Sequence, residues 1–328
     1  MPTPIKLFFT GGGGAGTIEA VKVLKALGYE VVTADATPTS AGFSWADRSY
    51  VIPFGADDAF VPALREIVRR ERPDFIIPLV DEEIPKVHRF VREEVPTLKI
   101  VGPTLEFSEL TLDKWTMAQA LTRHGLSVAR SWLASDAAAA TYPAIVKPCQ
   151  GRGSRGLAFL DGPGDLRAYL AAAAQPADRY IVQERLHGRE FTTSVVVGLD
   201  GTLFSIVPKE AADKRGITQV GITRSVPAID ELCRGITKAL DPRGPYNVQL
   251  IVGDDGVPCV IEINPRYSTT MALTLASGVN EVDVVLRHAR GEDPGQLTFT
   301  PDLMMLRYTA QIYVKESEWR PIDLRAKP

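Results

Sequence analysis

The first hundred residues of the chain alternate between two patterns of apolar positions. Short apolar runs predict buried β-strands at residues 6–10, 29–34, 75–79 and 98–101. Between these runs, apolar residues recur at helical spacing and predict helices after residue 16, over 58–71 and over 81–94. Strands that alternate with helices at this spacing are typical of a parallel, doubly wound sheet. We therefore expect an N-terminal α/β domain.

The pattern changes after about residue 103. Helices are predicted over 112–124 and near 165–174, and short strands at 128–133, 144–147, 157–160 and 179–184. From residue 190 onward, longer alternating runs are joined by tight turns. Asp200-Gly201, between the runs 191–199 and 202–207, is typical of a β-hairpin. The rest of the chain is therefore expected to be mixed α and β, with antiparallel hairpins.

One predicted hairpin, residues 246–266, carries the most information about chemistry. We expect Asp255-Gly256 to form its two-residue turn, because this dipeptide favours that geometry. Counting outward from the turn pairs apolar residues on one face, as Val252–Cys259, Leu250–Ile261 and Val248–Ile263. That face is expected to lie against the core.

The opposite face of this hairpin is polar near its open end. Counting predicts that Gln249 faces Glu262 and that Asn247 faces Asn264. Directly opposed residues have Cβ atoms about 4.5–5.5 Å apart, so the side-chain oxygens of Gln249, Glu262 and Asn264 would meet at one spot. Mg²⁺ prefers oxygen ligands, usually together with substrate phosphates, which Arg266 would also reach. The alternative is a solvent-facing polar side of a strand.

Two further segments favour a nucleotide. A loop rich in glycine and cations, residues 147–156, follows an apolar strand and offers backbone N–H groups to phosphates. Its alternative is an ordinary surface hairpin. The connection 184–190 offers backbone groups to an adenine and a carboxylate to a ribose, although its composition also suits an ordinary connection.

These residues resemble the ATP-grasp superfamily, most closely its carbamoyl-phosphate-synthase-like branch. The resemblance covers about residues 5–292, and its most specific part is Glu262-Ile-Asn-Pro-Arg266 together with Gln249. It implies an α/β chain with the ATP-grasp fold in three parts. These are a pre-ATP-grasp α/β domain at 1–110, a linker helix with a small lid at 111–186, and a large catalytic part with a C-terminal extension at 187–328.

The resemblance also implies roles for individual residues. Gln249, Glu262 and Asn264 would bind the metal, and Arg266 would contact the transferred phosphate. Lys147 would contact the α-phosphate and the adenine edge, and with Arg266 it would act in catalysis by positioning the phosphates. Residues expected to bind the nucleotide are Lys114, Lys147, Gly151, Gly153, Ser154, Gly156, Glu184, Leu186, Glu190 and Lys209. Arg224 and Arg307 are candidates for the substrate, with a surface salt bridge as the alternative for each. The implied cofactors are ATP and Mg²⁺, with Mn²⁺ as an alternative metal.

One feature departs from many members of the superfamily, which have a carboxylate where this chain has Gln249. The neutral amide lowers the negative charge of the site by one, and the resemblance identifies it as a marker of the branch. The chain also shows no second ATP-grasp copy, glutaminase or biotin-carrier segment. We therefore expect neither a complete carbamoyl-phosphate synthase nor a self-contained biotin carboxylase.

A rival interpretation comes from the glycines of the first turn. Gly11, Gly13 and Gly16 match a dinucleotide fingerprint after a strand, and Asp35 follows about twenty residues later. This pattern alone would favour an NAD-dependent oxidoreductase. The resemblance instead implies the same turn without NAD, in a cleft that helps to bind the acceptor substrate.

The expected function is ATP-dependent activation of a small-molecule carboxylate as an acyl phosphate, followed by its ligation to an amine. One alternative is activation of bicarbonate or carbamate, and another is a nucleotide-binding regulator without turnover. The sequence does not identify a general base for the amine. The resemblance is also compatible with a homodimer.

Composition narrows these expectations only slightly. The net charge of −3, from 37 basic and 40 acidic residues, argues against a nucleic-acid or membrane partner. It would still hide a cationic cleft formed by Lys114, Lys147, Arg152, Arg155, Lys209 and Arg266. Three distant cysteines suggest reduced thiols, and four histidines lack metal-ligand spacing. With no signal-peptide or membrane-spanning pattern, a cytoplasmic protein is expected.

Overall fold

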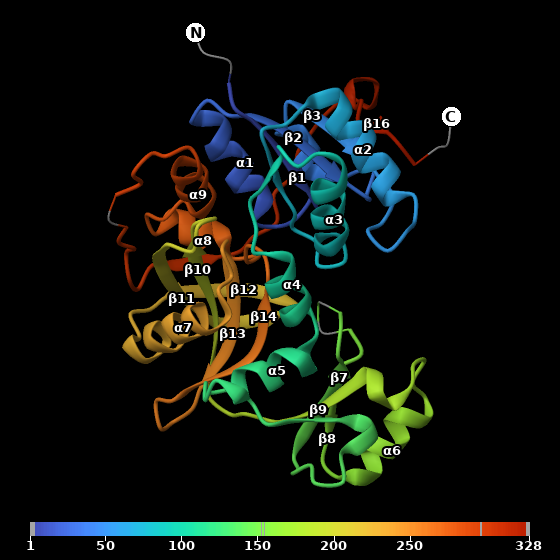
Figure 1. The fold of residues 1–328 in the computed structure, drawn as a ribbon, viewed down its shortest axis with the longest axis vertical. Helices are drawn as coiled ribbons and strands as arrows, with labels where there is room; N and C mark the ends of the chain where they lie inside the picture. Colours follow the sequence, from blue (N-terminus) through green and yellow to red (C-terminus); the bar gives the residue numbers. More distant parts are fainter. Residues whose placement is uncertain (1–3, 152, 154, 296, 326–328) are drawn as a thin grey trace.

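A computed structural model describes residues 4–151, 153, 155–295 and 297–325 of the chain. Within these residues the strands form three sheets. Figure 1 shows the N-terminal sheet at the top, a large sheet in the middle and a small sheet at the bottom. The α/β class expected from the sequence is confirmed.

The N-terminal sheet is parallel, in the order β16-β3-β2-β1-β4-β5. Its strands are β1 (Lys6–Thr10), β2 (Glu30–Asp35), β3 (Arg48–Val51), β4 (Phe75–Ile77), β5 (Lys99–Ile100) and β16 (Ile322–Asp323). Its helices are α1 (Thr17–Ala26), α2 (Phe60–Glu71) and α3 (Ile84–Glu94), with a short 3-10 helix η1 (Ala41–Ser44). Alternation along β1 separates the two faces: Leu7 and Phe9 pack with α1, whereas Phe8 packs with α2 and α3.

The small sheet is antiparallel, in the order β6-β9-β7-β8. It contains β6 (Ser131–Leu133), β7 (Ala144–Pro148), β8 (Ala158–Leu160), β9 (Tyr180–Glu184), α6 (Pro163–Ala171), η2 (Ala134–Asp136) and η3 (Ala177–Arg179). Two helices, α4 (Leu105–Leu112) and α5 (Lys114–Arg123), connect the N-terminal sheet to it. The small sheet has a separate apolar core, so it forms its own packing unit.

The large sheet has the order β14-β13-β10-β11-β12-β15 and antiparallel pairing throughout. Its strands are β10 (Arg189–Val197), β11 (Leu203–Arg215), β12 (Ile217–Thr223), β13 (Tyr246–Val252), β14 (Pro258–Asn264) and β15 (Met304–Leu306). The accompanying helices are α7 (Pro227–Leu240), α8 (Met271–Ala276), α9 (Glu281–Ala289) and η4 (Glu316–Glu318). Helices α4, α5 and α7 contribute to the core on one face.

A shared core joins the N-terminal and large sheets. Helix α1 packs against α8 and α9, and Val196 and Val207 of the large sheet belong to the same cluster as Leu7 of β1. Gly16 permits the close approach, because a Cβ there would lie 2.7 Å from Met271. The two sheets are therefore held as one packed unit above the small sheet (Figure 1).

Two remaining features concern the chain as a whole. Within the described residues, no helix combines the length and apolar character needed to cross a membrane. Cys149, Cys233 and Cys259 are free thiols, and burial raises the pKa of each.

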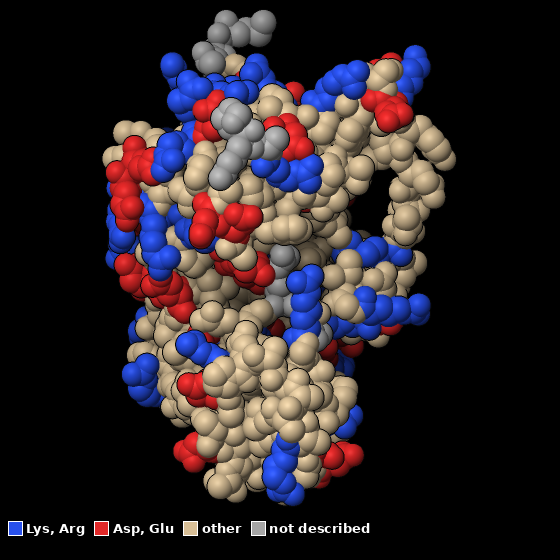
Figure 2. All heavy atoms as spheres, turned by 90° about the vertical axis from the view of Figure 1, so that its right-hand side faces the viewer, with Lys and Arg blue, Asp and Glu red and all other residues tan. Residues whose placement is uncertain are grey.

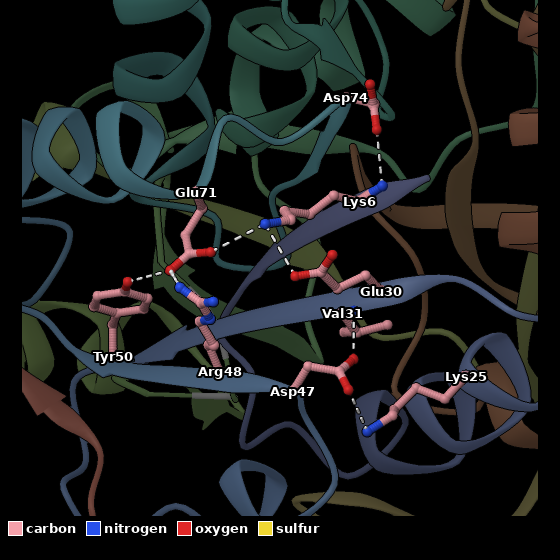
Figure 3. Close-up of polar contacts among 9 residues, drawn as sticks. All are labelled: Lys6, Lys25, Glu30, Val31, Asp47, Arg48, Tyr50, Glu71 and Asp74. Carbon is pink, nitrogen blue, oxygen red and sulfur yellow. Dashed lines mark hydrogen bonds and ion pairs between the residues drawn. The ribbon is translucent and has the colours of Figure 1, made fainter. Parts of the chain in front are cut away.

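A buried carboxylate fastens α2 to the N-terminal sheet. Figure 3 shows Glu71, at the end of α2, pointing to side chains from β1 and β3. Its carboxylate accepts hydrogen bonds from Tyr50, from Lys6 Nζ at 3.3 Å and from Arg48 Nη1 at 3.3 Å. Lys6 Nζ also lies 2.9 Å from Glu30 Oε1 on β2. Burial opposes ionisation, but these partners hold the pKa of Glu71 below its usual range.

Replacing Glu71 with Ala is expected to lower the free energy of unfolding by about 3 kcal/mol, because it removes one partner of a buried ionic network. The loss is measured by urea unfolding at pH 7. Glu66→Ala on the same helix, which removes only pairs with the exposed side chains of Arg69 and Arg70, is the control with a much smaller change. Since the pKa of Glu71 is depressed in the folded state, its contribution is present above the unfolded pKa. The difference between the two proteins should shrink as the pH falls through the folded-state pKa. Equal midpoints for wild type and Glu71→Ala would contradict this role.

Candidate active site

The polar residues of the β13–β14 hairpin lie as the sequence predicts. Gln249 is directly opposite Glu262, and Asn247 is directly opposite Asn264. Both asparagines are buried, whereas Gln249 and Glu262 are half-buried. The amide and carboxylate groups therefore stand together on one face at the open end of the hairpin.

The tip of the same hairpin differs from the prediction. Gly253 N–H bonds to the Val257 carbonyl oxygen, so the loop has three residues rather than two, and Gly256 takes the left-handed conformation (φ 77°). Leu250 pairs with Val260 instead of Ile261, and Val252 pairs with Pro258 instead of Cys259.

A bulge explains why the open end nevertheless matches the expected register. The pairing shifts between Gln249 and Leu250, which leaves Ile261 as the extra residue of β14. One additional loop residue and one bulged residue compensate for each other, so Gln249 still meets Glu262. Val260 therefore takes the core position that the sequence assigned to Ile261, and it is fully buried.

The bulge also supplies a contact to the small sheet. Lys147, the penultimate residue of β7, donates from Nζ to the Ile261 carbonyl oxygen at 3.3 Å. The lysine is buried, and burial lowers its pKa to about 8 although the negative charge of Glu262 opposes the shift. A lysine from the small sheet therefore reaches the polar face of the large sheet.

A second lysine joins the glycine-rich loop to the hairpin. Lys114 is the first residue of α5, where the Asp113 side chain accepts hydrogen bonds from the N–H groups of Trp115 and Thr116. Its Nζ donates to the Gly151 carbonyl oxygen at 2.8 Å and lies 3.4 Å from Glu262 Oε1. Lys114 and Lys147 therefore bring two cations to the polar face.

Arg266 connects the hairpin to the N-terminal sheet. Its Nη2 donates to Asp81 Oδ2 at 3.2 Å and to Asn264 Oδ1 at 3.2 Å, and its Nε donates to Asp81 Oδ1. Asp81 lies in the turn between β4 and α3, and both side chains are largely buried. Burial opposes the charge of Arg266, but Asp81 raises its pKa, so the guanidinium stays protonated. The site prediction missed Asp81 because its partner lies 185 residues away.

Two spaces meet at Arg266. A cavity of about 120 Å³ is lined by residues that include Glu190, Lys214, Gln249, Glu262, Asn264 and Arg266. A pocket of about 500 Å³ lies beside it, between the first glycine turn and the segment after β14, and its lining includes Gly11, Gly14, Asp35, Thr37, Arg155 and Arg266. Ser268 and Thr269 also line both spaces. Figure 2 shows acidic and basic side chains gathered around the hollow between the upper and lower parts of the molecule.

The glycine-rich loop borders both spaces. Gly151, Gly153 and Gly156 all have positive φ angles (130°, 67° and 70°), which side chains rarely adopt. Gly153 lines the cavity, whereas Arg155 lines the larger pocket. Ser154 and Arg152, also expected to act here, lie outside the described residues.

The connection between β9 and β10 carries the residues expected to bind the adenosine. Glu190 lines the cavity, where its carboxylate pairs with Lys214. Glu184 is paired instead with Arg130, whose backbone N–H and Nε each donate to its carboxylate at 2.8 Å. Leu186 is half-buried in the connection itself. The roles of these residues toward a nucleotide stay predictions.

Lys209 lies away from the cavity, although it was expected to bind the nucleotide. Its side chain is fully buried, and Nζ donates to the hydroxyls of Ser194 and Thr274. Ser194 in turn donates to the buried carboxylate of Glu281 at 2.8 Å. These contacts support a role in joining α8 and α9 to the sheet.

Arg224 and Arg307 were expected to hold a substrate. Among the described residues, neither arginine lines the cavity or the larger pocket. The Arg224 guanidinium pairs with Glu210 at 2.8 Å and with Asp302 at 2.6 Å. Arg307 donates to the backbone carbonyl oxygens of Thr218 and Thr269. Arg224 therefore forms the salt bridges expected as its alternative role, whereas Arg307 contacts backbone oxygens instead of a carboxylate.

The polar face fits a divalent metal that arrives with additional oxygen ligands. Within the described ranges, no three His, Cys, Asp or Glu side chains come together, and Glu262 is the only carboxylate among the three expected ligands. Mg²⁺ accepts such sparse sites because water and phosphate oxygens complete its shell. Asn264 Nδ2 is buried with no hydrogen-bond partner among the described residues, and leaving it so costs about 1–3 kcal/mol. A bound phosphate oxygen would satisfy this amide.

Two parts of the chain match known protein families. Residues 177–311 match a family described as ATP-grasp in the biosynthetic pathway with Ter operon. Residues 7–97 match the family of PylC-like N-terminal domains. The two matches cover the β9–β15 region and most of the N-terminal sheet.

Individual relatives are more distant. The chain is 27% identical to the carbamoyl phosphate synthase large chain of Thermotoga sp. (strain RQ2), a match covering 74% of this chain but 24% of that protein. It is also 27% identical to the formate-dependent phosphoribosylglycinamide formyltransferase of Pseudomonas aeruginosa (strain LESB58), covering 88% of this chain and 75% of the relative. The solved structure of an L-amino acid ligase from Bacillus licheniformis shares the fold with a TM-score of 0.69 and 18% identity, covering 88% and 75% of the two chains.

Replacing Asp81 with Asn is expected to lower the free energy of unfolding by about 3 kcal/mol, because it leaves the buried Arg266 guanidinium without its counter-charge. Urea unfolding measures the loss. Glu93→Gln, at an exposed position of α3, is a matched control with little effect. Combining Asp81→Asn with Arg266→Gln should cost less than the sum of the two single variants. Strictly additive losses would show that the two side chains do not interact.

Proposed function

Because the chain belongs to the ATP-grasp superfamily, we propose that it is an ATP-dependent ligase that joins a small-molecule carboxylate to an amine. The carboxylate is first converted to an acyl phosphate. The names of the relatives support this choice, since both a formate-dependent formyltransferase and an L-amino acid ligase act on carboxylates. The chain spans only 24% of the carbamoyl phosphate synthase large chain, so the activity of that whole enzyme is not transferred.

The observation that carries the proposal is the junction of the two spaces at Arg266. On one side of this residue stand Gln249, Glu262 and Asn264, which suit a metal and phosphates. On the other side is a pocket of about 500 Å³, large enough for a small organic substrate. A guanidinium at the boundary can hold a transferring phosphoryl group while the acceptor, the carboxylate substrate that takes up this group, lies in the adjacent pocket.

The cations around the cavity suit a nucleoside triphosphate. In the proposed complex, Lys114 and Lys147 exchange their carbonyl partners, Gly151 and Ile261, for phosphate oxygens. Gln249, Glu262 and Asn264 would hold Mg²⁺, which would supply positive charge to offset that of the phosphates. Glu190, which lines the cavity and pairs with Lys214, would accept hydrogen bonds from a ribose.

The proposed reaction has two steps. An oxygen of the substrate carboxylate forms a bond to the γ-phosphorus while the bond to the ADP oxygen breaks, which gives an acyl phosphate and ADP. The amine then attacks the acyl carbon, phosphate leaves and the amine loses a proton. Arg266 and Lys147 orient the phosphates, because positioning and electrostatics supply most of the catalysis in phosphoryl transfer. No protein side chain becomes covalently attached.

The dinucleotide interpretation of the first turn has less support. Asp35 Oδ2 accepts the N–H of Gly13 at 2.8 Å, and Oδ1 accepts the N–H of Thr37 at 2.9 Å. The carboxylate that would contact a ribose in an NAD site is therefore occupied in organising the loop. We assign this turn to the wall of the acceptor pocket.

The buried position of Lys147 leads to a pH-dependent affinity for Mg-ATP. Burial holds the pKa of free Lys147 at about 8, and phosphates favour its charged form. Affinity should therefore be full below pH 8 and fall by about tenfold as the pH rises from 7 to 9.5. Calorimetry of Mg-ATP binding measures this effect. Lys147→Arg, which keeps its charge, should remove the pH dependence, and an unchanged profile in this variant would contradict the assignment.

Replacing Glu262 with Ala should lower Mg²⁺-dependent release of ADP by at least about a hundredfold, because it removes the one carboxylate of the metal face. Glu231→Ala, at an exposed position of α7, is the control that should keep wild-type turnover. Substrates for this assay come from screening amino acids and small carboxylates in pairs with amines. Hydroxylamine should trap the activated carboxylate as a hydroxamate. ADP release that needs bicarbonate instead of an organic acid would favour bicarbonate activation.

A further inference from the structure

The segment that follows β15 contacts the walls of both spaces, and the proposed function gives it no role. It begins at Arg307, which donates from Nε to the Thr218 carbonyl oxygen at 2.9 Å and from Nη2 to that of Thr269 at 3.1 Å. Both threonines line the smaller cavity, and Thr269 also lines the larger pocket. The start of the segment is therefore fixed at the boundary between the two spaces.

The far end of the segment is fixed on the N-terminal sheet. Figure 1 shows it, in red, reaching the sheet beside β3, where β16 pairs in parallel with Tyr50 and Val51. Before β16, the indole N–H of Trp319 donates to the Pro38 carbonyl oxygen at 3.0 Å. The Trp319 ring also lies against Phe43, with ring centroids 6.1 Å apart. Trp319 is half-buried, whereas Tyr313 earlier in the segment is 90% exposed.

Both partners of Trp319 belong to the loop that follows β2, residues 36–47. This loop lies directly on the first glycine turn. A Cβ on Gly42 would be 2.0 Å from the Gly12 carbonyl oxygen, and one on Gly13 would be 2.3 Å from Ser40 Oγ. The backbone of Gly42 thus touches that of Gly12, and the Ser40 side chain lies against Gly13, so a movement of the loop must displace the turn.

The same loop and turn form the outer wall of the larger pocket. Gly11, Gly14, Asp35 and Thr37 all line it. Asp35 joins the two parts, because its carboxylate accepts the N–H groups of Gly13 and Thr37. Trp319 therefore contacts the loop at Pro38 and Phe43, beside the residues of the same loop and turn that line the pocket.

We infer that residues 307–325 hold the outer wall of the acceptor pocket in place, and that Trp319 is a positioning residue for the acceptor substrate. The meaning of the pocket rests on the proposed function, whereas the support of the wall by Trp319 does not. Trp319 acts through the loop and the glycine turn, and it contacts neither the metal face nor Arg266.

Amide hydrogen exchange of the full chain tests the support of the wall without any substrate. In Trp319→Ala, peptides covering residues 11–17 and 36–44 should exchange about threefold to tenfold faster than in wild type, the range for loss of an aromatic contact. Peptides covering 246–264 should be unchanged. In Trp319→Phe, which keeps an aromatic ring, the exchange rates of these peptides should lie between those of wild type and Trp319→Ala. Tyr313→Ala is the matched control, in which the rates should not change. Equal exchange of wild type and Trp319→Ala in 11–17 and 36–44 would overturn the inference.

Steady-state kinetics test the positioning of the acceptor. With a carboxylate and an amine found by the screen, Trp319→Ala should raise the KM of the acceptor about threefold to tenfold and leave kcat and the KM for ATP unchanged. A parallel fall in kcat with unchanged KM values would overturn the positioning role. If every screened acid fails to release ADP from wild type, the proposed ligase activity fails, and the exchange experiment alone decides whether Trp319 holds the wall.

Discussion

The ion pair between Asp81 and Arg266 is the contact on which the arrangement of the site depends. It joins the turn after β4 to the end of the β13–β14 hairpin, across 185 positions of the chain. Removing two charges from water is costly, so a buried pair is weak evidence for stability in itself. Its geometric effect is larger: the same guanidinium contacts Asn264 and lines both spaces. The pair therefore sets the distance between the polar face of the β13–β14 hairpin and the larger pocket.

The small sheet approaches this fixed unit through Lys114 and Lys147. Both ammonium groups are largely buried, and they contact the backbone carbonyl oxygens of Gly151 and Ile261. A carbonyl oxygen offers only a partial charge, and burial accordingly lowers the pKa of Lys147. Phosphate oxygens would be stronger partners for these cations. In the proposed complex, a nucleotide would replace these weak lysine–carbonyl contacts between the small sheet and the rest of the molecule by stronger lysine–phosphate contacts. The closer approach would also exclude water.

Local patterns predicted much of the fold and part of the site. Strand β1 followed from its short apolar run, because both of its faces are buried. The pairing of Gln249 with Glu262 followed from counting outward along the hairpin, and it holds because the extra loop residue and the bulge compensate for each other. The predicted turn and pairing at the tip of the β13–β14 hairpin were wrong. A three-residue loop with a bulge at Ile261 has the same apolar pattern along the sequence as a two-residue turn. Strands β16 and β3 were not predicted. Neither has a long apolar run, and the two strands pair although they lie far apart in the sequence. The positions of Lys209 and Arg224 depend on tertiary partners that spacing along the sequence does not reveal.

The charge of the candidate site is locally positive although the chain has a net charge of −3, which suits the proposed binding of ATP. Lys114, Lys147 and Arg266 meet around Glu262, and Asp81 offsets only one of these three cations. Gln249 contributes an oxygen without a charge, so the protein alone would hold a divalent metal weakly. In the proposed complex, the phosphates of ATP would supply the missing negative ligands and would also neutralise the lysines. Metal and nucleotide should consequently bind as a unit, and the substitution of a carboxylate by Gln249 strengthens this dependence because it leaves the cations in excess.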